Sequence, residues 1–348
     1  MSKIQIDQFD PQVVRDGILQ RKEGDAVRCL TCSHRCLIQE NRLGVCGTRI
    51  SSNSSLKTLV YGNVSSISNN PIEKKPLFHF APGTMALTVG SWGCNASCPF
   101  CQNFDISKRK PTPELTNYVS PEKFVNMAQK RGSNGTSVSF SEAATLMLEW
   151  NLEVFRIAKN RGLYNTIVTN GYMTPEALNL MIDAGLDAAN VDVKGCEPQV
   201  RKMCGINLQP VLDNILLIIE RNVHVELTTL IVPGLNDDME CLETIAKWIL
   251  EYAGPKTPWH LNRYHPAYEY TRPSTSLGLL NKAREMARKT ELEFVYIGNV
   301  GIRGLEDTVC PRCGTLCYER LGFSSRNVAT DTDGKCRECG YDIGIHMI

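Results

Sequence analysis

The stretch Gly93-Cys94-Asn95-Ala96-Ser97-Cys98-Pro99-Phe100-Cys101-Gln102-Asn103 decides how the rest of this chain is interpreted. Its three cysteines have the spacing C-x3-C-x2-C and directly follow an apolar stretch at residues 85–89. Thiolates are preferred ligands of zinc, Cu(I) and iron–sulfur clusters, and a cluster of four irons normally takes four protein ligands. Three ligands leave one iron open to another molecule. The stretch therefore predicts such a cluster, with a structural zinc loop completed by a distant ligand as the alternative.

Length and composition limit the class of protein. The 348 residues favour about two domains, or one large α/β barrel with small attachments. The net charge of +1 gives no electrostatic argument for binding nucleic acid or an anionic membrane. We expect neither an export signal nor a membrane segment, because no stretch reaches the roughly 18 apolar residues that span a bilayer. The 15 cysteines are therefore expected to be reduced, metal-binding thiols of a cytoplasmic protein.

A second cysteine set lies near the amino terminus. Its four members, spaced x2, x3 and x9, are Cys29, Cys32, Cys36 and Cys46. A closed set of four thiolates suits zinc or a second iron–sulfur cluster. A segment this small also needs a crosslink, because it has little core of its own. Unliganded buried or reactive cysteines are the alternative.

A third cysteine set lies near the carboxyl terminus. Two C-x2-C pairs, separated by 22 residues, are formed by Cys310, Cys313, Cys336 and Cys339. This arrangement is typical of a zinc ribbon. Cys317 follows the first pair at a spacing that also suits an auxiliary iron–sulfur cluster, so that alternative stays open.

Between these sets the sequence alternates between strands and helices. Strands are expected at residues 86–90, 136–140, 165–169, 186–193, 223–232, 259–263 and 293–297, with helices between them. The pattern has no hairpin signals, so it favours a parallel sheet with right-handed crossovers. Six or seven such units predict an α/β fold, a partial (β/α)6 barrel like that of TIM, with its chemistry at the carboxyl ends of the strands.

Two small segments are expected to flank this barrel. Boundaries near residues 55 and 305 give a cysteine-rich segment at 1–55, the barrel at 56–305 and the zinc-ribbon-like segment at 306–348. Within the first, we expect a helix at 11–21. Strands are expected at 57–63 and 64–68.

Polar side chains follow several of the expected strands. In chain order they are Ser141 and Glu142, Thr169 and Asn170, Asp192 and Lys194, and His265. A carboxylate such as Glu142 can accept a hydrogen bond from the ammonium group of a ligand, or it can simply complement a helix start. Asp192 and Lys194 share one face of a strand, which suits either a ligand or a buried structural ion pair. The stretch 259–268 can line the substrate side or form a polar rim.

Three cysteines stand outside the three sets. They are Cys196, Cys204 and Cys241. We expect each to pack in the core, because free cysteine is among the most buried residue types. Cys204 has a second interpretation as a hydrogen donor near a radical site.

The C-x3-C-x2-C spacing, with an aromatic residue before its last cysteine, resembles the radical S-adenosylmethionine (SAM) superfamily. Further stretches at 44–49, 71–80 and 231–237 and the carboxyl-terminal pairs look like the radical enzymes of the AmmeMemoRadiSam system. Those are relatives of pyruvate formate-lyase activating enzymes. The similarity covers nearly the whole chain. Where that family commonly has Thr-Tyr-Asn-Glu-Pro, this chain has Ser139-Phe140-Ser141-Glu142-Ala143, which keeps the carboxylate and loses the proline.

The resemblance implies which residues form the active site. A [4Fe–4S] cluster would be held by Cys94, Cys98 and Cys101, with Lys194 also in the catalytic group. SAM would bind among Phe100, Ser141, Glu142, Thr169, Asn170 and Asp192. Its reductive cleavage would give a 5′-deoxyadenosyl radical, and this chemistry belongs to the cofactor while the protein directs it.

The resemblance also implies a substrate class and partners. The radical would abstract hydrogen from a substrate, expected to be a protein as for an activating enzyme, and an electron donor such as flavodoxin or ferredoxin would supply the reductant. Radical modification of a peptide, RNA or small molecule is the alternative, although the charge balance does not favour nucleic acid. A zinc-binding adaptor without enzymatic activity is the third hypothesis.

Overall fold

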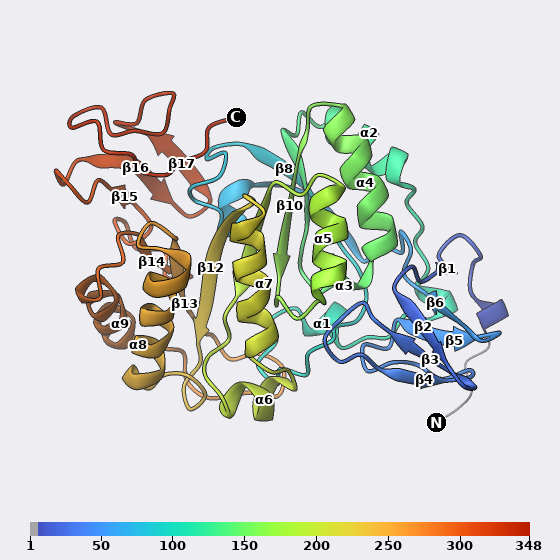
Figure 1. Cartoon of the computed structure of the whole chain (residues 1–348). Coiled ribbons are helices and arrows are strands. Elements are labelled where there is room, and N and C mark those ends of the chain that lie inside the picture. The colour runs from blue at the N-terminus through green and yellow to red at the C-terminus, as the bar shows by residue number, and fades with distance from the viewer. Residues whose placement is uncertain (1–5) are drawn as a thin grey trace.

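The fold is organised around one eight-stranded sheet, seen in a computed structural model that describes residues 6–348 (Figure 1). From edge to edge the strands are β14 (Val295–Gly298), β13 (Trp259–Arg263), β12 (His224–Ile231), β11 (Ala188–Asp192), β10 (Tyr164–Thr169), β9 (Gly135–Val138), β8 (Met85–Gly90) and β7 (Ser66–Pro71). Neighbours from β8 to β14 are parallel, whereas β7 pairs antiparallel with β8. The predicted parallel sheet is confirmed and is consistent with a partial barrel; it has seven parallel strands, within the six or seven units expected and one more than the (β/α)6 count.

Six longer helices connect the strands. They are α2 (Pro121–Lys130), α4 (Leu148–Asn160), α5 (Pro175–Asp183), α7 (Gln209–Glu220), α8 (Met239–Trp248) and α9 (Leu277–Lys289). Side chains of Ser120, Thr174, Asp238 and Ser276 cap four of them by accepting a backbone N–H from the first turn. The helical stretch between β9 and β10 is divided at Met147 into α3 (Ala143–Leu146) and α4. Among the described residues, no helix combines the length and the apolar character that crossing a membrane requires.

The amino-terminal segment is built from short strands. They are β1 (Arg15–Asp16), β2 (Gln20–Glu23), β3 (Ala26–Cys29), β4 (Leu37–Gln39), β5 (Arg49–Ser52) and β6 (Ser55–Thr58), in two three-stranded sheets. The helix predicted at 11–21 is therefore wrong. Its residues pair across the sheet instead, with Arg15 opposite Thr58 and the Gly17 N–H donating to the Leu56 carbonyl at 2.8 Å. Tertiary pairing overrides the weak local helix signal here.

A buried ion pair fastens this segment to the barrel. Arg49 is 1% exposed and donates from Nη1 and Nη2 to the two carboxylate oxygens of Glu149 in α4, at 2.7 and 2.9 Å. Bidentate pairing of this kind fixes orientation as well as position. The hairpin of β5 and β6 also spans the boundary expected at residue 55, so the domain boundaries stay predictions.

The carboxyl-terminal segment lies at the opposite end of the sheet (Figure 1). Its strands are β15 (Thr308–Val309), β16 (Leu316–Leu321) and β17 (Ser324–Asn327). Arg320 is 1% exposed and donates to the Phe78 carbonyl at 2.7 Å, in the connection between β7 and β8. The strand arrows of β10 and β12 point away from this segment and toward the end where the amino-terminal sheets lie. The two cysteine-rich segments thus occupy opposite ends of the parallel strands.

A buried carboxylate organises the interior near the amino ends of the strands. Glu226 in β12 is fully buried and lies 2.7 Å from His260 Nε2 and 3.0 Å from His224 Nε2, and it accepts the backbone N–H of His79 at 2.7 Å. Burial alone would raise the pKa of Glu226, but the hydrogen bonds from His224 and His260 hold that pKa well below its usual value. His260 is thus part of this buried network, so it fits neither of the two alternatives for the stretch 259–268, a substrate-lining residue or a polar rim.

His79 makes the stability of the fold sensitive to acid. Burial lowers the pKa of His79 to about 3, whereas an unfolded histidine has a pKa of about 6.5. Between these values the unfolded chain binds a proton that the folded chain does not, so the free energy of unfolding falls as the pH falls, by up to about 1.4 kcal/mol per pH unit. We expect His79→Gln to remove this contribution in urea unfolding at pH 7.5, 6.5 and 5.5.

The exposed residue His265 offers the matched control. His265→Gln should retain the wild-type dependence on pH. Equal pH dependence in the wild type and in His79→Gln would contradict the prediction.

Candidate active site

One cavity of about 230 Å³ lies at the carboxyl ends of the central strands. Its lining includes all ten residues that the sequence assigned to the cluster and to SAM. They are Cys94, Cys98, Phe100, Cys101, Ser141, Glu142, Thr169, Asn170, Asp192 and Lys194. The structure brings these residues together from the ends of four strands, β8 to β11. Their individual roles stay predictions.

The cysteine loop leaves β8 and packs against the amino-terminal segment. Gly93 has a φ of +83°, and a Cβ at this position would lie 2.7 Å from Thr48 Cγ2 and 2.9 Å from the Cys46 carbonyl oxygen. Only glycine permits both this conformation and this close approach. The loop continues into α1 (Phe104–Ser107), and the Gly93 N–H donates to the Ile106 carbonyl at 3.0 Å. The loop is therefore held at both of its ends.

The thiols of the loop take part in hydrogen bonds. The Ala96 N–H donates to Cys94 Sγ at 3.3 Å, and Cys101 Sγ lies 3.1 Å from Ser107 Oγ. A hydrogen bond with Cys204, at the end of α6 (Gln199–Cys204), lowers the pKa of Cys98 to about 6. Stabilising a thiolate favours binding of a soft metal centre.

Cys204 is a neighbour of the cysteine loop, although the sequence assigned it to the core, with a role near a radical site only as its second interpretation. It is fully buried, as expected, but it is a neighbour of a cluster-loop cysteine and not only a packing residue. The Ser97 N–H donates to the Cys204 carbonyl at 2.8 Å, which fixes α6 against the loop. Because the two cysteines are far apart in the chain, no local spacing could have indicated this contact.

Glu142 is buried and held by three protein donors. Its Oε1 accepts from Thr169 Oγ1 at 2.5 Å and from Thr145 Oγ1 at 2.7 Å, and its Oε2 accepts the Asn170 N–H at 2.9 Å. Burial raises the pKa of Glu142 despite these hydrogen bonds. Phe140, with a φ of +78°, forms the turn that brings this carboxylate back to the end of the strand. A non-glycine residue in the left-handed region is uncommon and marks a constrained site.

Asn170 connects the end of β10 to the cysteine loop. Its Nδ2 donates to Asn95 Oδ1 at 2.7 Å, and its Oδ1 accepts the Tyr172 N–H at 3.0 Å. With its backbone N–H bound to Glu142, Asn170 is fixed on every side by hydrogen bonds. An Asn-Gly sequence by itself favours a turn, but here Asn170 also links the end of β10 to the cysteine loop.

Asp192 and Lys194 form an ion pair at the end of β11. Lys194 Nζ lies 2.9 Å from Asp192 Oδ2, and the two side chains are 17% and 32% exposed. Burial acts to lower the pKa of Lys194, but Asp192 and the thiols of Cys98 and Cys204 raise it well above its usual value. The contact agrees with the alternative that Asp192 and Lys194 form a structural ion pair. Both residues also line the cavity. Lys194 therefore places a positive charge beside the cysteine loop.

Other lining residues were missed by sequence reasoning. They include Lys108, Phe140, Thr228, Leu230, Asn262 and Asn299. Asn262 lies in β13, within the polar stretch noted at 259–268, and alternation along the strand could have distinguished it from its neighbours. His265 is instead exposed, with Nε2 3.3 Å from the Asn299 carbonyl oxygen.

The expectation that Cys196 and Cys241 pack in the core as separate thiols is wrong. They form a disulfide between the connection after β11 and α8, 45 residues apart in the chain. The expectation that all cysteines are reduced therefore does not hold for this pair. The error arose because a pairing between isolated cysteines depends on the tertiary arrangement.

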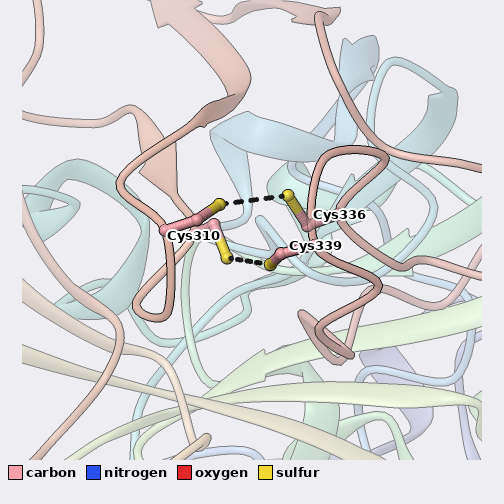
Figure 2. A group of neighbouring side chains, drawn as sticks. Cys310, Cys336 and Cys339 are labelled. Carbon is pink, nitrogen blue, oxygen red and sulfur yellow. Dashed lines mark hydrogen bonds between the residues drawn. The ribbon is translucent and has the colours of Figure 1, made fainter.

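The carboxyl-terminal cysteines converge away from the cavity. Figure 2 shows Cys310, Cys336 and Cys339 turned toward one another. The sulfurs of Cys310, Cys313, Cys336 and Cys339 all lie within 4.8 Å of one another, with Cys310 3.6 Å from Cys339 and Cys313 3.7 Å from Cys336. Cys317 does not belong to this group. Four sulfurs at such separations suit one tetrahedral ion.

Comparison with known proteins identifies the family. The family described as the Radical SAM superfamily matches residues 90–249. An uncharacterised protein of Methanocaldococcus jannaschii is 37% identical over 335 residues, which cover 95% of this chain and 99% of that protein. This chain belongs to the radical SAM superfamily. It is therefore an enzyme, and the hypothesis of a zinc-binding adaptor is excluded.

Two other relatives relate this radical SAM enzyme to activating enzymes. A second protein of Methanocaldococcus jannaschii, provisionally named as a glycyl-radical enzyme activating enzyme, is 27% identical over 237 residues, covering 65% of this chain and 92% of that protein. The pyruvate formate-lyase 1-activating enzyme of Escherichia coli is 25% identical over 162 residues, covering 45% and 65%. The predicted relationship to this group is confirmed.

Membership of the superfamily implies SAM and a [4Fe–4S] cluster in general, and the cysteine loop fits such a cluster. Its three thiols face one cavity, and three is the number that leaves an iron open. Within residues 6–348, Asn95 Nδ2 is a buried donor of this loop without a hydrogen-bond partner. Buried donors are nearly always paired, so this atom supports a group bound beside the loop.

Cys204 should tune the cluster without being its ligand. We expect Cys204→Val to retain the iron but to shift the reduction potential to more negative values. The shift should be on the order of 40 mV, the equivalent of about 1 kcal/mol for one lost hydrogen bond to a ligand sulfur. A redox titration followed by electron paramagnetic resonance (EPR) measures this shift, and Cys204→Ser should largely restore the wild-type potential. Loss of iron in both variants would contradict the prediction and make Cys204 a ligand.

Proposed function

We propose that this enzyme reductively cleaves SAM and uses the resulting radical to abstract hydrogen from a substrate bound over the open sheet. When bound, a [4Fe–4S] cluster with one open iron supplies an electron to the sulfonium of SAM, and a 5′-deoxyadenosyl radical results. The observation that carries the proposal is the convergence of three thiols, a buried carboxylate and an ion pair on one cavity.

In this proposal Cys94, Cys98 and Cys101 hold the cluster. Glu142 accepts a hydrogen bond from the ammonium group of SAM. An ionised carboxylate has about four acceptor sites, and three of those of Glu142 are used by Thr145, Thr169 and the Asn170 N–H. One site is left for a donor in the cavity. Because the other three are satisfied by protein, the carboxylate is already oriented before the cofactor binds.

The remaining lining residues hold the cofactor in place and balance charge. Lys194 offsets the negative charge of the thiolates while Asp192 keeps Lys194 oriented, at 2.9 Å. Ser141, Thr169 and Asn170 supply further polar contacts at the strand ends. Phe100 packs edge-on against Tyr270 at 6.2 Å between ring centroids, and we assign its ring to the adenine side.

We infer a protein or peptide substrate, in the manner of an activating enzyme, and a cytoplasmic flavodoxin or ferredoxin as the electron donor. The relationship to glycyl-radical and pyruvate formate-lyase activating enzymes supports this inference. EPR of a candidate glycyl-radical enzyme incubated with this protein, SAM and a reductant tests it. A stable protein radical supports activation, whereas a changed substrate mass without that radical supports modification of a peptide, RNA or small molecule.

Cys98→Ala should abolish cleavage of SAM, because two thiolates cannot retain the cluster with one open iron. The measurement is 5′-deoxyadenosine formed under anaerobic conditions with SAM and dithionite after reconstitution, and we expect a decrease of at least 100-fold. The matched control is Cys317→Ala, a buried cysteine in the carboxyl-terminal segment, which should retain wild-type cleavage. Formation of 5′-deoxyadenosine at the wild-type rate by Cys98→Ala would falsify the proposed function.

We also propose that the carboxyl-terminal set binds structural zinc, as the separation of its sulfurs supports. Cys339→Ala should lose one zinc per chain in metal analysis and should lower the thermal stability of the segment, since bound metal contributes folding free energy. Cys317 lies outside the set, so the control variant Cys317→Ala should retain the zinc. Iron in place of zinc in anaerobically purified protein, or equal zinc in both variants, would rule the assignment out.

A further inference from the structure

The connection between β13 and α9 crosses the carboxyl edge of the sheet to the cysteine loop. In the sheet, β9, β10, β11 and β12 lie between β13 and β8, and the cysteine loop follows β8. Even so, the Glu269 N–H in this connection donates to the Pro99 carbonyl at 3.0 Å. Pro99 lies between Cys98 and Phe100 in the loop. The connection therefore reaches across the open sheet and is attached to the proposed cluster loop.

Two tyrosines of this connection pack against aromatic residues of the cysteine loop and of α1. The ring of Tyr268 stacks on Phe104, with 5.3 Å between the centroids and 19° between the planes. Tyr270 meets Phe100 edge-on, at 6.2 Å and 74°. Of these four rings, that of Phe100 lines the cavity. The contact of Tyr270 is therefore the one that bears on the proposed SAM site.

Tyr270 is itself held from two further sides. Its Oη donates to the Pro233 carbonyl, in the connection after β12, at 2.6 Å. Tyr264 Oη donates to the Tyr270 carbonyl at 2.5 Å, and the two rings meet edge-on at 5.8 Å between centroids. Tyr264 is fully buried, so it gives this contact a fixed base. The position and the plane of the Tyr270 ring are therefore determined by protein contacts and not by a bound ligand.

The orientation of Phe100 decides what this wall of the cavity offers to a ligand. Phe100 is 4% exposed and lines the cavity. Aromatic pairs prefer offset-stacked or edge-on arrangements, so an edge-on neighbour favours one plane of the ring. A ring that is held in one plane before a ligand binds lowers the cost of ordering the site. The contact with Tyr270 should therefore act on the affinity for a ligand in the cavity.

From these contacts we propose that Tyr270 is a positioning residue for SAM. Its ring sets the plane of Phe100, whose ring is assigned above to the adenine side. Tyr270 is not among the residues that line the cavity, so it acts through Phe100 and not by contact with SAM. The inference rests on the proposed function for the identity of the ligand. It gives the connection after β13 the role of holding the far wall of the SAM site.

A double-mutant cycle on the affinity for SAM tests this proposal. The variants are Tyr270→Leu, Phe100→Leu and the two combined, in the full chain reconstituted with its cluster under anaerobic conditions. Equilibrium dialysis with radiolabelled SAM gives the Kd. The loss of one edge-on aromatic pair corresponds to a rise in Kd of about three- to tenfold. We expect this rise for Tyr270→Leu alone, and a change of less than about twofold when Tyr270→Leu is added to Phe100→Leu.

Two variants of the same connection are the controls. Tyr270→Phe keeps the ring and its edge-on contacts, so its Kd should stay within about twofold of the wild type. Tyr268→Leu removes the neighbouring ring, which stacks on Phe104 and not on a cavity residue, and should retain the wild-type Kd. If Tyr270→Leu binds less iron than the wild type, Tyr270→Met makes the same comparison with a longer apolar side chain.

The outcomes separate this proposal from the proposed function. An unchanged Kd in Tyr270→Leu overturns the positioning role. An equal loss of affinity in the Phe100→Leu background or in Tyr268→Leu also overturns it, because the effect would then be a general loosening of the connection. An enzyme that binds SAM but forms no 5′-deoxyadenosine contradicts the proposed function, and its Kd values still decide whether Tyr270 acts through Phe100.

Discussion

The proposed chemistry depends on keeping three cysteine thiols of one short loop against a common cavity. A loop of this length does not hold that arrangement by itself, because ordering its backbone costs about 1–2 kcal/mol per residue. A chain of hydrogen bonds supplies the order: Asn95 is bound by Asn170, and the Asn170 N–H is bound by Glu142. The carboxylate proposed to receive the cofactor thus also fixes the loop proposed to hold the cluster. A change in the geometry of the proposed metal site would therefore also change the geometry of the proposed SAM site.

The carboxyl and amino ends of the parallel strands differ in function: one end forms the cavity and the other stabilises the fold. At the carboxyl ends, polar and charged side chains face a cavity and the amino-terminal segment packs against the cysteine loop. At the amino ends, Glu226 with its histidines and Arg320 are buried and hydrogen-bonded, and Arg320 fastens the carboxyl-terminal segment to the connection before β8. Stability and chemistry are therefore separated along the strands, as is usual when active sites lie at the carboxyl ends of parallel strands.

The sequence predicted those features that local patterns determine. Strand β13 was placed at its observed bounds, and the metal sets were visible because their cysteines are close together in the chain. Contacts between distant residues were not predictable in this way. Cys204 reaches Cys98 from α6, Cys196 pairs with Cys241, and the segment at 11–21 forms strands because β6 and β3 are available to pair with it. Each of these depends on tertiary packing, which no spacing or periodicity records.

The most direct measurement of the central claim is electron–nuclear double resonance of the reduced enzyme with SAM labelled with ¹⁷O in its carboxylate and ¹⁵N in its amino group. If three cysteines leave one iron open, both labels should couple magnetically to the cluster. Absence of both couplings in enzyme that still cleaves SAM, or evidence that a fourth cysteine such as Cys204 binds that iron, would contradict it.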